Sequence, residues 1–370
     1  MKLPAYILLF LILPGLFACT EPYDADIRTD QKILVVDGYL DNQVGNSYVK
    51  LSVAIPYDST GIPQRVTGAS VSVHDNTGTA IPFKETSAGY YKPLKSSFAG
   101  EINKSYTLTV NTPDGLVYVS KSEKMMPQLN PIKVSGGYNK QEIVIKDYYG
   151  NYSKKVTDFC EIYYDFSGES EEIPRFRFTS SQLAEYIIYK ELPIPKDTLT
   201  GYWFYCWLTT ADNNLRFTNE KYPTNSVEVK NQTVCTTNPD KKIQVCDMNL
   251  KTLNYDDTVI TIYEFKRIVK INQFRLNEDS YTFYKGVENQ AEAEGKMFDP
   301  SVTQLYGNIT CQTDPGKIAL GFFEVSSVST LSWIIDRNGP GTPVKFSPTP
   351  NFTFPSDNFT INHTPAFWIK

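Results

Sequence analysis

Histidine is nearly absent from this chain, which has two among its 370 residues. His74 lies in an alternating stretch and His363 in a tail rich in Pro and Thr. Neither belongs to an HExxH or comparable metal-binding pattern, and no GxSxG motif supports a Ser-His-Asp triad. The sequence therefore points to no catalytic, metal-binding or cofactor-binding residue, and we expect a protein that is not an enzyme. A glycosidase pair of carboxylates stays open, because acidic residues are plentiful.

An excess of basic residues is also missing. Lys and Arg number 36 against 41 Asp and Glu, which gives a formal net charge of −5. Nucleic-acid binding needs a basic surface, so we expect no nucleic-acid partner. The one long apolar run, residues 3–18, is too short to cross a bilayer as a helix, which takes about 20 residues.

The N-terminus has the features of a secretory signal followed by a lipidation site. Lys2 precedes the apolar run, and a small residue, Ala18, ends it. Leu16, Ala18 and Cys19 fit a bacterial lipobox, in which the Cys thiol carries diacylglycerol. We expect residues 1–18 to be a signal peptide and Cys19 to become a lipidated N-terminus. The alternative is an ordinary signal that happens to end near a cysteine.

A short acidic segment follows the cysteine. Residues 19–31 lack apolar periodicity, which indicates a flexible tether. Glu21, Asp24 and Asp26 resemble the surface-export signal of Bacteroidota lipoproteins. A solvated acidic linker is the alternative.

The other five of the six cysteines give no zinc-site spacing. Cys235 and Cys246 flank the turn-rich segment 236–240 and are candidates for a disulfide that closes a hairpin. An exported protein can form such a bond. Free, buried cysteines are the alternative.

Residues 32–127 predict an immunoglobulin-like or transthyretin-like β-sandwich. Short alternating segments recur every eight to twelve residues between turn signals. Alternation places one face of each strand in a core and the other in water. The expected core residues are Leu34, Val36, Leu51, Val53, Val71, Val73, Leu108 and Val110.

Residues 128–370 predict a larger β-rich domain with a few short helices, beginning after the break near Met126-Pro127. Aromatic residues make up 14% of the chain, which favours strands. We expect one helix over 181–191. We expect another over 278–293, capped by Asn277, with Tyr281, Tyr284 and Val287 on its buried stripe.

The segment 201–207 is aromatic throughout apart from Gly201 and Cys206. A core strand covered on both faces is the favoured interpretation. The alternative is a sugar-stacking platform that uses Trp203, Trp207 or Trp368, in a protein that binds or processes surface glycans.

Several motifs together resemble a known family. The set comprises Asp37-Gly38, residues 68–75 and Gly89-Tyr90, then 281–284, Phe298-Asp299-Pro300, Gly307-Asn308-Ile309 and Leu320-Gly321-Phe322-Phe323. In order and spacing it is similar to the Bacteroidota lipoprotein family catalogued as domain of unknown function 4249. Ser301 departs from the Gln-Pro that many members have at this point.

The resemblance implies an outer-membrane lipoprotein at the cell surface that acts as a non-enzymatic accessory of a TonB-dependent receptor in ligand capture or uptake. It implies no catalytic residue. A structural, adhesin-like module is a further alternative. Ser59, Thr198 and Thr258 stand in Asp-Ser/Thr-aliphatic triplets that resemble Bacteroidota O-glycosylation sites; β-turns are the alternative for each.

Overall fold

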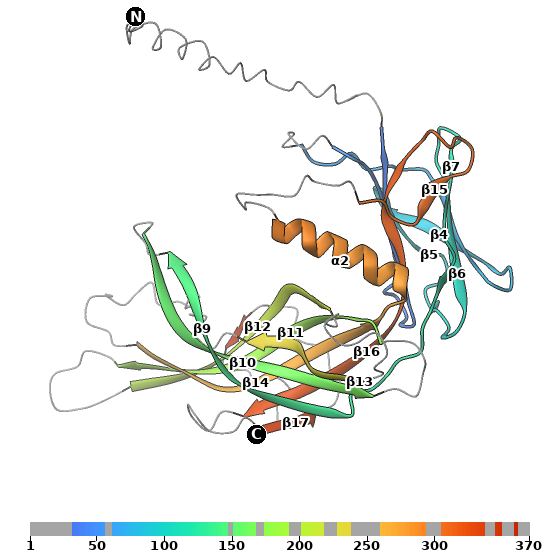
Figure 1. Cartoon of the computed structure of the whole chain (residues 1–370). Helices are drawn as coiled ribbons and strands as arrows, with labels where there is room; N and C mark the ends of the chain where they lie inside the picture. Colours follow the sequence, from blue (N-terminus) through green and yellow to red (C-terminus); the bar gives the residue numbers. More distant parts are fainter. Residues whose placement is uncertain are drawn as a thin grey trace, which may run out of the picture. The chain divides into compact units, whose positions relative to one another are not determined.

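Nearly all the regular structure in the described part of this chain is β-strand (Figure 1). The structure is a computed structural model, and it describes residues 32–55, 61–146, 151–167, 174–191, 201–217, 228–237, 260–293, 305–336, 345–349 and 359–361. Almost all of these residues belong to one compact unit, Ile33–Ala54 together with Pro63–Lys370. The prediction of a mainly β fold is confirmed.

The first half of the chain supplies β1 (Leu34–Asp41), β2 (Tyr48–Val53), β3 (Ser70–Asp75), β4 (Ala80–Ser87), β5 (Tyr90–Pro93), β6 (Ser105–Asn111), β7 (Val117–Ser120), β8 (Glu123–Lys124), β9 (Lys133–Lys146), β10 (Tyr152–Ser167) and β11 (Phe176–Glu191). The second half supplies β12 (Gly201–Phe217), β13 (Glu228–Thr237), β14 (Ile260–Arg275), α2 (Glu278–Ala293), β15 (Ile309–Cys311), β16 (Ala319–Asp336), β17 (Lys345–Thr349) and β18 (Phe359–Ile361).

One large sheet joins the two halves of the chain through β16. Its main path runs β15-β7-β6-β3-β4-β5-β2-β1-β16-β14-β11-β12-β18, while β13, β10 and β9 form a separate sheet. The first part of β16, Ala319–Ser326, pairs in parallel with β1, and the rest, from Ser327 to Asp336, pairs antiparallel with β14. The strand can be followed between both sets of partners in Figure 1. That the N-terminal strands form two facing sheets, as in a sandwich, stays a prediction.

The core of the N-terminal strands follows the predicted parity. Seven of the eight expected core residues are buried, from Leu34 to Val110. The exception is Val53, which is half-buried because it ends β2. This core also contains Ile309, Cys311, Ala319, Phe323 and Val325 from the C-terminal part. The expected domain boundary at residue 127 stays a prediction, but the N-terminal core is not built from residues 32–127 alone.

A second core lies around β10, β11, β14 and β16. It is rich in aromatic rings, among them Tyr164, Phe166, Phe176 and Phe178. The indole Nε1 of Trp333 donates a 2.7 Å hydrogen bond to the Tyr164 hydroxyl, so the polar end of this ring pair is satisfied.

The prediction of a helix over residues 181–191 is wrong. These residues lie in β11, paired with β12 on one side and β14 on the other. The spacing of Leu183, Tyr186 and Ile187 suits a helix, but Tyr186 to Tyr189 are aromatic and β-branched residues that favour strands. Pairing on both sides decides the outcome.

The helix expected over 278–293 is confirmed as α2. Asn277 caps it, with its side-chain oxygen accepting a 2.9 Å hydrogen bond from the Ser280 N–H. Tyr281 is buried and Tyr284 half-buried. Val287 is 36% exposed, so its predicted place on the buried stripe is wrong.

Two of the motifs that carry the family resemblance pack against each other. Asn308 holds Phe323 through both main-chain groups: its Oδ1 accepts from the Phe323 N–H at 2.9 Å and its Nδ2 donates to the Phe323 carbonyl at 3.0 Å. A Cβ on Gly307 would stand 1.4 Å from the carbonyl oxygen of Gly321. The backbones approach so closely that only glycine fits at position 307.

Candidate functional site

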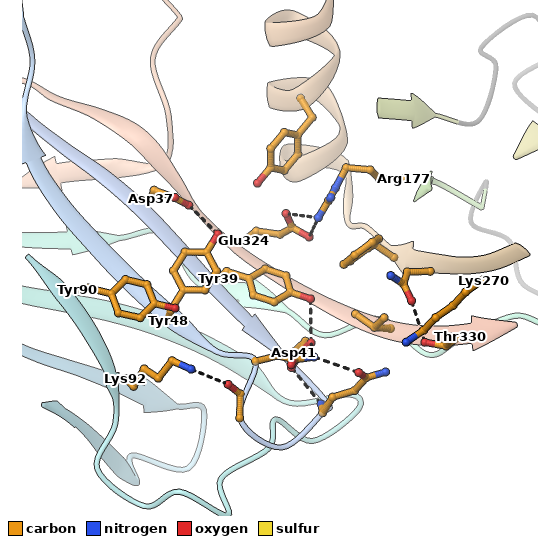
Figure 2. Close-up of a pocket in the computed structure, with 17 residues that line it drawn as sticks. Asp37, Tyr39, Asp41, Tyr48, Tyr90, Lys92, Arg177, Lys270, Glu324 and Thr330 are labelled. Atoms are coloured by element: carbon orange, nitrogen blue, oxygen red, sulfur yellow. Dashed lines mark hydrogen bonds and ion pairs between the residues drawn. The ribbon is translucent and has the colours of Figure 1, made fainter. Parts of the chain in front are cut away.

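An open pocket of about 770 Å³ lies over β5, β2, β1, β16, β14 and β11 (Figure 2). Side chains along a strand point alternately to its two faces. In these strands the side chains of one face pack in the cores, and those of the other face line the pocket. In β1 the side chains of Leu34, Val36 and Leu40 lie in the core, while those of Asp37, Tyr39 and Asp41 line the pocket. The lining consists of Asp37, Tyr39, Asp41, Gln43, Gly45, Asn46, Tyr48, Tyr90, Lys92, Arg177, Lys270, Asn272, Phe274, Tyr284, Glu324, Val328 and Thr330.

A row of tyrosine rings forms one side of the pocket. Figure 2 shows Tyr90, Tyr48 and Tyr39 one after another. The ring centroids are 5.6 Å apart for the first pair and 5.7 Å apart for the second. Strand register creates the row, because Tyr39 lies directly opposite Tyr48 in the β1–β2 pair. Phe274 extends it, 6.3 Å from Tyr39 and edge to face.

Hydrogen bonds and charge fix the middle ring of the row. The Tyr48 hydroxyl donates to Asp37 at 3.3 Å, and the Lys50 ammonium binds the same carboxylate at 3.1 Å. The Lys50 Nζ also lies 4.4 Å from the Tyr48 centroid, in cation–π range. Burial, followed by the negative charge of Asp37, raises the pKa of Tyr48, so it stays a neutral donor.

Asp41 organises the loop at the end of β1. Its carboxylate accepts hydrogen bonds from the Tyr39 hydroxyl at 2.9 Å, the Gln43 N–H at 3.0 Å and the Asn46 amide at 3.0 Å. Burial raises the pKa of Asp41 above its ordinary value, and the three donors oppose that shift. Burial also raises the pKa of Tyr39, with Asp41 adding to it.

A buried ion pair crosses the floor of the pocket. The Arg177 Nη2 lies 2.9 Å from both carboxylate oxygens of Glu324, which is 0% exposed. The Ser326 hydroxyl donates a 2.7 Å hydrogen bond to the same carboxylate. The guanidinium lies 4.0 Å from the centroid of Phe274 and 5.2 Å from that of Tyr284. Burial acts to lower the pKa of Arg177, but the charge and hydrogen bond of Glu324 together with the neighbouring Tyr284 and Tyr39 outweigh it, and the pKa is raised.

Tyr284, which lies on helix α2, also belongs to the floor of the pocket. Its neighbour Phe283 stacks on Phe322 of β16 at 4.8 Å between centroids, which fixes the helix on the sheet. Burial raises the pKa of Tyr284 well above its ordinary value, and the charge of Glu324 raises it further. Tyr284 is therefore a neutral phenol at physiological pH.

The described lining suits binding through hydrogen bonds and ring faces. Carboxylates and side-chain amides accept hydrogen bonds, and ammonium, amide and hydroxyl groups donate them. Of the described residues that line the pocket, none is His, Cys or Ser. In the described ranges there is also no group of three or more His, Cys, Asp or Glu side chains arranged to hold a metal.

Most site residues expected from the sequence lie outside the described residues. This holds for Cys19, Ser59, Thr198, Cys246, Thr258 and Trp368. Cys235 belongs to β13, and Trp203 and Trp207 belong to β12, but only the backbone of these strands is described. The proposed lipidation, disulfide and glycosylation therefore stay predictions, as does the tryptophan platform.

The pocket itself was not predicted from the sequence. A signal was present, because Tyr48 and Lys50 alternate with the core residues of their strand and Asp37, Tyr39 and Asp41 do the same in β1. Alternation alone says that these residues point away from the core. It does not say that Arg177 and Phe274 meet them there.

The chain belongs to the family described as domain of unknown function (DUF4249), whose model matches residues 20–332. Every residue that lines the pocket lies within that range. Among curated proteins and among solved structures, no match was found. No helix in the described part of the chain is both long and apolar enough to cross a membrane.

Proposed function

We propose that this protein is a lipid-anchored lipoprotein of the outer membrane, exposed at the cell surface, that captures a ligand for a TonB-dependent receptor. It acts as a non-enzymatic accessory. The observation that carries the proposal is the open pocket, whose lining offers ring faces, donors and acceptors from six strands and a helix. The lipobox ending at Cys19 supports the anchor.

Co-purification tests the partner. The full chain, extracted in mild detergent and captured through a C-terminal tag, should bring down a large outer-membrane protein. Recovery of the chain as a free monomer contradicts the receptor partnership. Tyr152→Ala changes an exposed residue outside the pocket lining, and as a control it should bring down the same outer-membrane protein as the wild type.

Substitution of the anchor tests the location. Cys19→Ser should abolish labelling with palmitate and release the protein into the soluble periplasmic fraction, because the thiol carries the acyl chains. If the wild type incorporates no palmitate, the lipobox interpretation is wrong. If it does, and Cys19→Ser still sediments with the membrane after a high-salt wash, a protein partner holds it.

A further inference from the structure

The charges in the pocket balance. Three carboxylates, Asp37, Asp41 and Glu324, line it, and so do three cations, Lys92, Lys270 and Arg177, while Lys50 lies outside the lining and pairs with Asp37. Arg177 and Glu324 neutralise each other on the floor. A lining without a large excess of either sign does not strongly concentrate a charged ligand by steering, so it favours a neutral, polar molecule.

Most of the strands under the pocket are paired on both sides within the described part of the chain. In the order of the sheet, β5, β2, β1, β14 and β11 each have a hydrogen-bonded neighbour on both sides, while β16 pairs with β1 over Ala319–Ser326 and with β14 over Ser327–Asp336. An extended peptide gains much of its affinity by adding a strand to an open edge. The pairing of these strands disfavours that mode, and the lining points to recognition through side chains.

The pocket lining offers two kinds of side chain for recognition, aromatic rings and hydrogen-bonding groups. The tyrosine row of Tyr90, Tyr48 and Tyr39 runs across three adjacent strands. The lining also contains the planar amides of Gln43, Asn46 and Asn272, together with the Lys92 ammonium. Aromatic faces carry negative charge density and attract polarised C–H groups, while amides donate to and accept from hydroxyls and ammonium groups donate to them.

We propose that this pocket binds a neutral oligosaccharide, with pyranose rings packed along the tyrosine row and hydroxyls bonded to the surrounding amides and charged groups. A pyranose has a C–H face for the rings and hydroxyls that both donate and accept. The inference rests on the proposed function, for which it names the class of ligand. It uses tyrosines of β1, β2 and β5 rather than the tryptophans of the sequence-based glycan hypothesis.

Binding to a defined panel tests the proposal. The purified full chain in detergent is applied to immobilised neutral oligosaccharides (gluco-, xylo-, manno- and galacto-oligosaccharides), with polygalacturonate, chondroitin sulfate and a mixed peptide library as the other arms. At least one neutral oligosaccharide should be retained. Retention of only the charged glycans or only the peptides overturns the proposal, and so does no retention on any arm.

Variants of the middle ring separate stacking from folding. Tyr48→Ala should weaken binding of the retained oligosaccharide about tenfold, because it removes a ring face. Tyr48→Phe keeps the ring, loses only the hydroxyl bond to Asp37, and should bind within about threefold of wild type. Tyr152→Ala, at an exposed tyrosine on β10, should bind as wild type does. Unchanged affinity in Tyr48→Ala overturns the stacking role.

The two proposals fail in different ways. If no neutral oligosaccharide binds but a large outer-membrane protein still co-purifies, the ligand class is wrong and the receptor partnership stands. If Tyr48→Ala loses the oligosaccharide yet still brings down the receptor, pocket and partner surface are separate.

Discussion

Arg177 and Glu324 are 147 residues apart in the chain and form the buried ion pair under the pocket. A buried pair of this kind adds little net stability, because desolvation of the two charges offsets their attraction. Here the Ser326 hydroxyl binds the carboxylate, and two aromatic rings lie against the guanidinium. Removing one partner leaves a buried charge uncompensated, which is costly.

Arg177→Met should therefore lower the free energy of unfolding by about 3–5 kcal/mol, measured by urea denaturation. Arg177→Met combined with Glu324→Met should regain most of that loss, since no charge is then left alone. A single variant that loses less than about 1 kcal/mol contradicts the assignment of a desolvated pair.

Asp41 should make stability depend on pH. Burial raises its pKa in the folded protein above the value of about 3.9 in an unfolded chain. The folded state then holds the proton more tightly, so its contribution to stability is lost as the pH rises from about 4 through the folded pKa.

The amide in Asp41→Asn does not titrate, so this variant lacks the pH-dependent contribution of the Asp41 carboxyl group. The stability of the wild type minus that of Asp41→Asn should fall as the pH rises above about 4 and then level off, in urea titrations between pH 4 and 8. Asp279→Asn, at an exposed aspartate of α2, is the matched control. Parallel curves for wild type and Asp41→Asn contradict the shift.

Among the elements, α2 shows how a local signal and a tertiary contact combine. Asn277 caps the helix and also donates to Glu123, a buried carboxylate that Asn308 binds at 2.7 Å. The cap is readable in the sequence, whereas the bond to Glu123 connects the helix to a strand 154 residues earlier. The helix is held in place by tertiary contacts as well as by its cap.

Two substitutions on this helix should differ sharply in their effect on the free energy of unfolding. Tyr281 is 6% exposed and packs with Leu276, so Tyr281→Ala should cost about 3 kcal/mol of unfolding free energy. Val287 is 36% exposed, and Val287→Ala should cost less than about 0.5 kcal/mol. Thermal or urea unfolding measures both, and equal losses contradict the observed face of the helix.

For the whole molecule, β16 is the element that both halves share. One end of it pairs with β1 and the other with β14, and Phe323 and Val325 lie in the N-terminal core. Without β16, one side of β1 is an unpaired edge, which is prone to association.

A chain of residues 32–127 alone should therefore not unfold in a cooperative transition. It lacks Ile309, Cys311, Ala319, Phe323 and Val325, all of which are buried in its core in the full chain. Linking residues 305–326 to its C-terminus should restore cooperativity, followed by urea titration with circular dichroism. A cooperative transition in the short chain shows that the N-terminal part folds by itself, as the sequence-based boundary implies.

The sequence by itself determined the mainly β class, the parity of the N-terminal core and the start of α2. Each of these depends on residues close together in the chain: alternation assigns a side chain to a face, and Asn277 caps the turn that follows it. The family resemblance was also readable, because its motifs are local strings of residues.

Only the tertiary structure decided that 181–191 is a strand, that 309–325 completes the N-terminal core and that a pocket exists. The strand depends on partners on both sides, β12 and β14. The pocket depends on register, which brings Tyr39 opposite both Tyr48 and Glu324. Pairing between strands far apart in sequence is set by the packing of the whole sheet, and no local pattern encodes it.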